Sequence, residues 1–344
     1  MKSNLRFGLI LAFVIGVAVT IIQFNTHRPR LLVLHSAGAE TERIRAINRG
    51  LRDELRNKNY FSIRWYYSGL SDKGDQGLAE AEGLRARRLV DGWAPKVILA
   101  VGDEAQQYVT RHYANRPDIK IVYCAVHDDV EPYGLDHAAN ATGAVMIPPL
   151  EALEEMLAGL GQQLGLKRPL RVVHLGDLSD DVGDDGEFMA ARHWSAVRFL
   201  GNHYVRTFDA WQATVRQAAK QTDFILTSDY RELARSATDP SRVPAEEVVA
   251  WTVEHSPVPV IGTRAQYVWD GGMLAMGASQ YEQGREAGSM AVRLLEQVVS
   301  PAVLPARSPK EFVVAARESR LMAQNLNLPP VYQALARASN NYFQ

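Results

Sequence analysis

The chain has 344 residues, of which 38 are basic and 39 are acidic, so its net charge is -1. This balance leaves no overall field that would attract nucleic acid, and no nucleic-acid partner is predicted. The single cysteine, Cys124, excludes an internal disulfide framework and a metal site built from cysteines. The length exceeds that of one typical domain and favours two similar lobes.

The first predicted element is an uncharged apolar run from Phe7 to Phe24. Lys2 and Arg6 place positive charge ahead of it, which predicts a cytoplasmic N-terminus and export of the residues that follow. No A-x-A-like triplet follows Phe24, and the run is close to the length of a membrane span. We therefore expect residues 1–30 to form a membrane anchor, with a cleaved signal segment as the alternative. The rest of the chain is expected on the periplasmic side of a bacterial inner membrane.

Short apolar runs then alternate with amphipathic helical stretches over residues 31–145. This alternation is typical of βαβ units and predicts a first α/β lobe with a parallel sheet. The expected strands cover residues 31–35, 61–67, 96–101 and 120–126. Between the first two, a helix is predicted from an apolar stripe of Ile44, Ile47, Leu51 and Leu55.

The same pattern recurs over residues 146–265, which we interpret as a second α/β lobe. After a predicted helix at 150–164, the expected strands are 170–175, about 196–206, 224–227 and 258–261. Residues 271–277 then lead into a long predicted helix from about 280 to 299. We expect residues of about 272–325 to complete the first lobe and residues 326–344 to form a C-terminal tail.

Several of these segments resemble a known family. The segment GGMLAMGASQYEQGREAGSMAVRLLEQVV at 271–299, with the later Leu304-Pro305, Phe312-Val313-Val314 and Leu326-Asn327-Leu328-Pro329, resembles the largely uncharacterised substrate-binding family of ABC transporters. The VLHS strand, the INRGLRDEL helix and the ATGAV crossover follow in the order that the family shows. The resemblance implies a type I periplasmic binding fold, with two Rossmann-like lobes joined by a hinge of three crossovers. Some relatives look like aromatic amino acid binders.

Candidate ligand contacts follow from the predicted sheets. In open parallel sheets the ligand lies beyond the carboxyl ends of the strands, where Ser, Thr and Asp can donate or accept hydrogen bonds. Helix capping is the alternative role for such residues. Tyr267 or the nearby Trp269 could stack on an aromatic ring. The candidates are Ser36, Ala37, Gly102, Asp103, His127 and Asp128 in the first lobe, and Asp177, Ser228, Asp229, Thr263 and Tyr267 in the second.

Motifs for catalysis and metal binding are weak in this sequence. The acidic segment 176–187 lacks the order of a calcium loop, so a solvated loop is favoured over a calcium site. The histidines lack H-x-x-x-H spacing, and no G-x-S-x-G elbow is present. We therefore predict no metal, no cofactor and no enzymatic activity. A hydrolase on the same scaffold, with His127 and Asp229 as its titratable pair, is the less favoured alternative.

These observations favour an extracytoplasmic solute-binding protein that holds a small molecule between two lobes. An amino acid or an aromatic or heterocyclic compound is the expected ligand class. The expected partner is an ABC permease or a membrane sensor. A membrane-anchored ligand-sensing or signalling ectodomain is the second interpretation.

Overall fold

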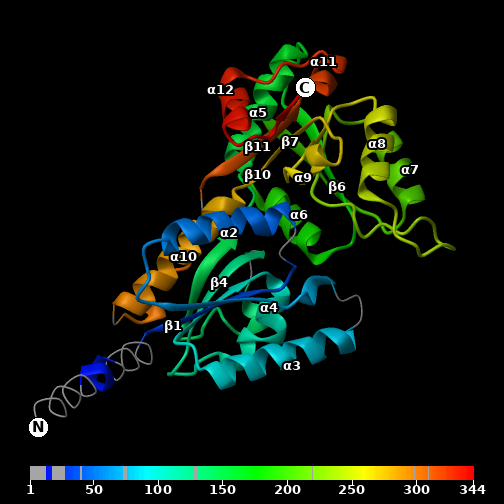
Figure 1. Cartoon of the computed structure of the whole chain (residues 1–344). Helices are drawn as coiled ribbons and strands as arrows, with labels where there is room; N and C mark the ends of the chain where they lie inside the picture. The colour runs from blue at the N-terminus through cyan, green and yellow to red at the C-terminus, as the bar shows by residue number, and fades with distance from the viewer. Residues whose placement is uncertain are drawn as a thin grey trace, which may run out of the picture. The chain divides into compact units, whose positions relative to one another are not determined.

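The computed structural model describes residues 13–17, 28–38, 41–72, 76–127, 130–218, 220–297, 299–308 and 310–344 (Figure 1). The chain divides into two compact units. Unit 1 comprises Met1–Val145 and Gln280–Arg307, and unit 2 comprises Met146–Ser279 and Ser308–Gln344. The chain therefore passes between the units at three places. The two-lobe α/β class predicted from the sequence is confirmed.

Unit 1 is built on a five-stranded sheet with the order β2-β1-β3-β4-β5. Neighbouring strands from β2 to β4 are parallel, as the alternating pattern predicts. Apolar side chains fill both faces of the sheet and form two hydrophobic clusters. The strands are β1 (Arg30–His35), β2 (Ser62–Tyr67), β3 (Val97–Val101), β4 (Lys120–His127) and β5 (Ala141–Met146).

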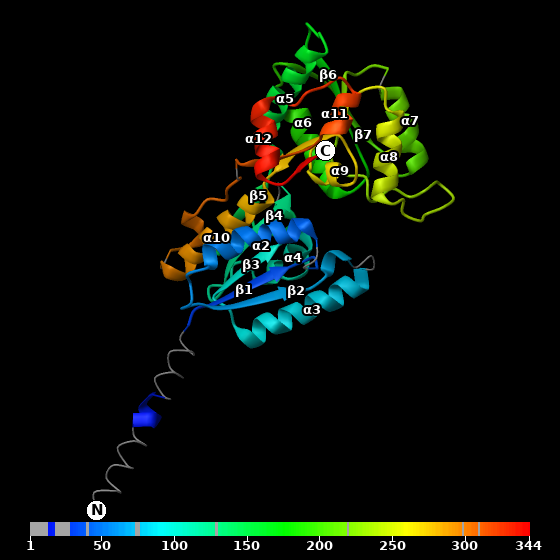
Figure 2. The same cartoon turned by 45° about the horizontal axis from the view of Figure 1, so that its top comes forward.

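Four α-helices cover the sheet of unit 1: α2 (Glu42–Leu55), α3 (Gln76–Trp93), α4 (Asp103–Tyr108) and α10 (Gln280–Glu296) (Figure 2). The predicted stripe of α2 is buried, and α2 packs against α10. Their contact needs small residues, since a Cβ atom on Gly50 would lie 2.0 Å from the carbonyl oxygen of Tyr281. Short 3-10 turns lie at Leu70–Asp72, Thr110–Tyr113, Glu131–Tyr133 and Pro301–Val303.

Unit 2 is built on a seven-stranded sheet with the order β12-β11-β10-β9-β8-β6-β7. Strand β11 runs antiparallel to its neighbour β10. The pairs β9–β10, β11–β12, β6–β7, β6–β8 and β8–β9 are parallel. The strands are β6 (Leu170–Gly176), β7 (Val197–Tyr204), β8 (Phe224–Thr227), β9 (Val260–Gly262), β10 (Leu274–Ala278), β11 (Phe312–Arg317) and β12 (Tyr342–Phe343). The helices are α5 (Leu150–Gln163), α6 (Asp180–Ala191), α7 (Phe208–Ala218), α8 (Ala245–His255), α9 (Gln266–Trp269), α11 (Glu318–Ala323) and α12 (Pro330–Ala338).

The C-terminal part of the chain is divided between the units differently from the prediction, in which residues of about 272–325 complete the first lobe. Only residues 280–307 return to unit 1, because β10 and β11 pair with each other and β10 also pairs with β9. Residues 326–344 do not form a separate tail. Tyr332 and Ala336 are buried in the core of unit 2, and β12 pairs with β11.

The solvated loop expected at residues 176–187 is wrong, because most of that segment belongs to helix α6. Met189 anchors the helix by packing into the core. Among the described residues, no three His, Cys, Asp or Glu side chains are grouped so that they could hold a metal ion.

Most of the predicted N-terminal segment lies outside the described residues. Phe13 to Val17 are described, and they are helical and exposed. No helix within the described part of the chain is both long enough and apolar enough to cross a membrane.

Candidate functional site

The carboxyl ends of β6, β8 and β9 meet at one edge of the sheet in unit 2. These strands are parallel neighbours, and Thr227 of β8 lies opposite Gly262 of β9. The next residues along the two strands, Ser228 and Thr263, are therefore adjacent. Their hydroxyl oxygens are 3.1 Å apart, and both residues are only 4 % exposed.

A line of buried hydrogen bonds runs from β7 through His174 to these hydroxyl groups. His174 lies opposite Asn202 of β7, and its Nδ1 is 3.1 Å from Asn202 Oδ1. On the other side of the ring, Nε2 is 2.8 Å from Ser228 Oγ. Because His174 is fully buried, the cost of desolvating its charged form lowers its pKa to about 4.

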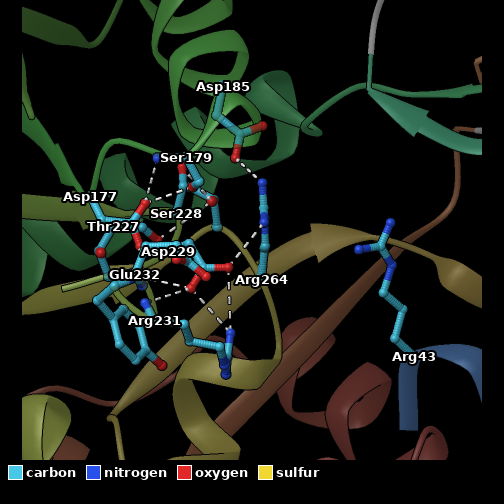
Figure 3. Close-up of polar contacts among 12 residues, drawn as sticks. Arg43, Asp177, Ser179, Asp185, Thr227, Ser228, Asp229, Arg231, Glu232 and Arg264 are labelled. Atoms are coloured by element: carbon cyan, nitrogen blue, oxygen red, sulfur yellow. Dashed lines mark hydrogen bonds and ion pairs between the residues drawn. The ribbon is translucent and has the colours of Figure 1, made fainter. Parts of the chain in front are cut away.

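Asp177 follows β6 and serves mainly to organise the neighbouring loops (Figure 3). Its Oδ1 accepts hydrogen bonds from the backbone N–H and the hydroxyl of Ser179, at 3.0 and 2.6 Å. Its Oδ2 accepts from the backbone N–H of Glu232 at 2.9 Å. Asp177 is 1 % exposed, so these contacts connect Ser179, which precedes α6, to the loop at Glu232.

Alternating charges continue from Asp229 along the same edge (Figure 3). Arg264 bridges Asp185 of α6, at 3.1 Å, and Asp229, at 3.4 Å. Arg231 contacts Asp229 at 3.2 Å and the buried Asp270 at 2.6 Å. The predicted residue Asp229 is thus the centre of a network with Arg231 from its own loop and Arg264 from the loop after β9.

Tyr267 is placed differently from the other candidates of unit 2. It is 2 % exposed, and its ring packs edge-on against Tyr230 in the core. Burial raises the pKa of its hydroxyl. The phenol therefore contributes to the core of unit 2 rather than to the polar edge.

Among the described residues, the corresponding edge of unit 1 is less densely connected. Ser36 is 3 % exposed, and Ser71 Oγ lies 2.8 Å from Ser36 Oγ and 2.9 Å from the Glu104 carboxylate. Gly102 has φ of +92°, and a Cβ atom there would lie 2.2 Å from Ser36 Oγ. Asp103 accepts a 3.0 Å hydrogen bond from the hydroxyl of Tyr133.

For the other three candidates of unit 1, the described residues show no side-chain hydrogen bond at this edge. Ala37 packs partly buried against the hydrophobic cluster under α2. His127 ends β4, but its side chain and the whole of Asp128 lie outside the described residues.

Two residues of unit 1 were missed by the sequence reasoning. Arg43, in the first turn of α2, donates to the carbonyl of Ala125 at 3.3 Å, and Ala125 has a φ of +52°. His35 is fully buried at the end of β1 and stacks on Tyr67 with 4.7 Å between ring centroids. Burial lowers the pKa of His35 to about 4. The sequence does contain a signal for His35, because a histidine at the end of a predicted buried strand is unusual.

In unit 2 the missed residues are His174, Asn202, Asp185, Arg231 and Arg264. The first two share a predicted sheet, but the register that pairs them includes an irregularity after Val172. The signal for His174 was the same as for His35, a histidine inside an apolar strand. The arginines lie in loops, whose conformation the sequence pattern does not specify.

Ser228, His174 and Asn202 have the order of a nucleophile, a base and an orienting group. The geometry alone would permit proton transfer from the serine hydroxyl. However, a histidine with a pKa of about 4 is a weak base at neutral pH. The arrangement is better suited to holding hydrogen bonds in a fixed direction than to activating a nucleophile.

Comparisons with known proteins agree with this architecture. A substrate-binding protein with adhesive properties from Clostridium difficile, in its ligand-free open form, is similar with a TM-score of 0.65 and 15% identity; the match covers 88% of this chain and 96% of that one. A conserved domain protein from Vibrio cholerae matches with a TM-score of 0.62 and 17% identity, covering 92% and 100%. This chain has the fold of periplasmic substrate-binding proteins.

A further solved structure with this fold is described as an ABC domain from Streptococcus pneumonia in complex with L-Trp. It has a TM-score of 0.59 and 14% identity, and the match covers 89% of this chain and 98% of that one. No protein-family model matches the chain, and no curated protein matches it. The resemblance noted in the sequence is thus confirmed at the level of the fold.

Proposed function

We propose that this protein is an extracytoplasmic solute-binding protein that captures a small molecule between its two units. The observation that carries the proposal is the polar edge of unit 2, where Ser228, Asp229 and Thr263 gather beyond the carboxyl ends of parallel strands. Ligands of open α/β sheets bind at such edges. The fold of substrate-binding proteins supports the same conclusion.

The ligand is expected to be a small polar or aromatic compound such as an amino acid. The neighbour from Streptococcus pneumonia is described as a complex with L-Trp, which supports including aromatic amino acids among the candidates. Ser36 and Asp103 are the contacts proposed from unit 1. Binding would be followed by hinge closure, and a permease of an ABC transporter would recognise the closed form.

The N-terminal segment is proposed to tether the protein to the periplasmic side of the inner membrane. The uncharged run from Phe7 to Phe24, preceded by Lys2 and Arg6, supports this placement. An intact mass that includes residues 1–30 in protein purified from membranes is the expected result. A mass lacking them would contradict the tether and leave a cleaved signal segment.

A ligand-sensing ectodomain is the second candidate, and the apolar run is the observation that favours it. A permease that cross-links to the protein in intact membranes would support the transport role. A cross-linked signalling protein in place of a permease would support the sensor.

The binding function itself is tested by thermal unfolding of the full chain in detergent. The compounds are amino acids, nucleosides, sugars, amines and small anions, each followed by product analysis. A ligand at a hundredfold excess over its dissociation constant should stabilise the folded protein by about 2.7 kcal/mol. Stabilisation by one chemical class with the compound unchanged is expected. No stabilisation, or consumption of the compound, would contradict the proposal.

A further inference from the structure

The buried line from Asn202 to Ser228 has a fixed hydrogen-bond direction. Asn202 Nδ2 donates to the backbone carbonyl of Gly186 at 3.0 Å. A carbonyl oxygen only accepts, so this contact sets the orientation of the amide and turns Oδ1 toward His174. The approach depends on a glycine, since a Cβ atom on Gly186 would lie 2.9 Å from Asn202 Oδ1 and 2.1 Å from Tyr204 Oη.

The amide orientation determines which nitrogen of His174 carries a proton. Asn202 Oδ1 only accepts, so Nδ1 must be the protonated nitrogen. At neutral pH the ring is uncharged, since burial lowers its pKa to about 4. Nε2 therefore has a lone pair, and the Ser228 hydroxyl 2.8 Å away must donate to it. The single proton of Ser228 is thus directed into the protein.

Two other hydroxyl groups at this edge, those of Thr263 and Ser179, are committed in the same way. Thr263 Oγ1 donates to Ser228 Oγ at 3.1 Å, with the Thr227 carbonyl 3.4 Å away as its other acceptor. Ser179 donates to the Asp177 carboxylate at 2.6 Å. Each hydroxyl has one proton and two lone pairs. Toward any further group, these side chains can only accept.

The charged side chains add to this acceptor character. Asp185, Asp229 and Asp270 pair with Arg231 and Arg264, which leaves an excess of one negative charge among these described residues. Both arginines are already paired with aspartates. A carboxylate ligand would add a further negative charge beside these aspartates, whereas an ammonium group would offset it.

We propose that the ligand presents a hydrogen-bond donor, a primary ammonium group, to Ser228 Oγ and Asp229, and that His174 and Asn202 are positioning residues that make Ser228 an acceptor. This inference rests on the proposed function, because it specifies the chemistry of the same ligand. It goes further in assigning a polarity to the contact and roles to two residues that do not touch the ligand. The ammonium would add N–H groups beside Ser228 Oγ and the Asp229 carboxylate, both of which accept.

The ligand side is tested with matched compounds in the thermal-unfolding assay of the full chain. Each pair shares a skeleton: phenethylamine with phenylacetate, tryptamine with indole-3-propionate, and L-tryptophan with indole-3-propionate. Every amine that stabilises the protein is compared with its N,N,N-trimethyl derivative, which keeps the charge but loses the N–H donors. Amines should stabilise, acids should not, and trimethylation should weaken binding at least tenfold.

The outcomes separate this inference from the proposed function. Stabilisation by the acids, or equal binding of the amine and its trimethyl form, overturns the donor assignment and leaves solute binding intact. No stabilisation by any compound in this set or in the wider panel of solutes overturns both.

The protein side is tested with Ser228→Ala, Ser228→Thr and the control Ser256→Ala. Ser256 is also a buried serine of unit 2, but its hydroxyl donates to the Val258 carbonyl at 2.7 Å. Ser228→Ala should weaken binding of the best amine about tenfold, as expected for one lost hydrogen bond to a charged group. Ser228→Thr, which keeps the hydroxyl, should restore most of the affinity, and the control should bind normally. Full affinity in Ser228→Ala would overturn the contact.

The positioning role has a spectroscopic test that does not require a ligand. Two-bond ¹H–¹⁵N correlation spectra distinguish the two neutral tautomers of histidine. His174 should carry its proton on Nδ1. In Asn202→Ala, which lacks the acceptor for this proton, the Nδ1–H tautomer should no longer be favoured. An Nε2–H tautomer in the native chain would overturn the assigned direction of the hydrogen bonds.

Discussion

Each unit buries one histidine near the carboxyl end of its first strand, and the two rings have opposite surroundings. In unit 2, both nitrogens of His174 are hydrogen-bonded, to Asn202 and Ser228. In unit 1, His35 lies beside Asn48 and stacks on Tyr67, but neither ring nitrogen has a well-formed hydrogen bond among the described residues. Comparable burial therefore produces a hydrogen-bond centre in one unit and a flat packing group in the other.

The comparison extends to the charged residues of the two edges. Arg264 in unit 2 bridges two aspartates, of which Asp185 has a side chain only 7% exposed. Arg43 in unit 1 contacts a backbone carbonyl, and no ion pair within 4 Å is found for it among the described residues. Buried charges that depend on each other make unit 2 the more sensitive edge. Substitutions in unit 2 should therefore cost more than matched substitutions in unit 1.

The largest effect is expected on acidification, which acts on both units. Burial lowers the pKa of His35 and of His174 from 6.5 to about 4. Between these values the unfolded chain binds more protons, so stability is present above pH 6.5 and is lost as the pH falls toward 4. From pH 7.5 to 4.5 each histidine should cost about 2–3 kcal/mol.

Urea unfolding at the two pH values measures this loss. His35→Phe and His174→Gln should each remove part of the pH dependence, whereas the exposed control His193→Gln should not. An unchanged pH dependence in both buried-site variants would contradict the assigned cause.

The next effect separates the two histidines at neutral pH. His174→Phe leaves Asn202 and Ser228 with unpaired polar atoms and should lower the free energy of unfolding by about 2–4 kcal/mol. His35→Phe keeps the stacking on Tyr67 and removes two nitrogens that lack partners, so its cost should stay below about 1 kcal/mol. Chemical denaturation of both variants provides the measurement. Equal losses would break the contrast drawn between the two rings.

The arginines provide a matched pair with a somewhat smaller expected effect. Arg264→Met leaves Asp185 and Asp229 without their shared cation and should cost about 2–3 kcal/mol, in the range for breaking a partly buried ion pair. Arg43→Met removes one hydrogen bond to a carbonyl and should cost about 0.5–1 kcal/mol. Urea midpoints at pH 7.5 compare the two. A larger loss for Arg43→Met would reverse the ranking of the edges.

The smallest effect concerns the serines next to each edge. Ser179→Ala removes the hydrogen bond from the Ser179 hydroxyl to the buried Asp177 carboxylate. This loss should lower the free energy of unfolding by about 1–2 kcal/mol. Ser71→Ala acts at a more exposed site beside Ser36 and should cost about 0.5 kcal/mol. Thermal unfolding resolves this difference when both variants are measured together. Indistinguishable melting temperatures would count against the tighter connection of unit 2.

Much of the architecture could be predicted because its signals are local. The strand at residues 224–227 and the buried stripe of α2 follow directly from apolar spacing. The start of α6 could not be predicted from apolar spacing, since it is rich in Asp and Gly, which are poor helix formers. The helix is stabilised by the packing of Met189 into the core. Tertiary contacts therefore decided this helix.

The candidate site, too, could be predicted only where its signals are local. Ser228 and Thr263 could be placed at the sheet edge because they follow parallel strands. The partners of Ser228 could not be predicted, because the contact of His174 with Asn202 depends on a strand register with an irregularity. Arg264 reaches Asp185 from 79 residues away in the chain, a contact that no spacing pattern encodes.

Isothermal titration of the full chain with the best amine from the matched compounds tests solute binding most directly, with analysis of the compound after the titration. We expect saturable binding of one molecule per chain, weakened about tenfold in Ser228→Ala, with the compound recovered unchanged. Absence of saturable heat, or conversion of the compound, would contradict it.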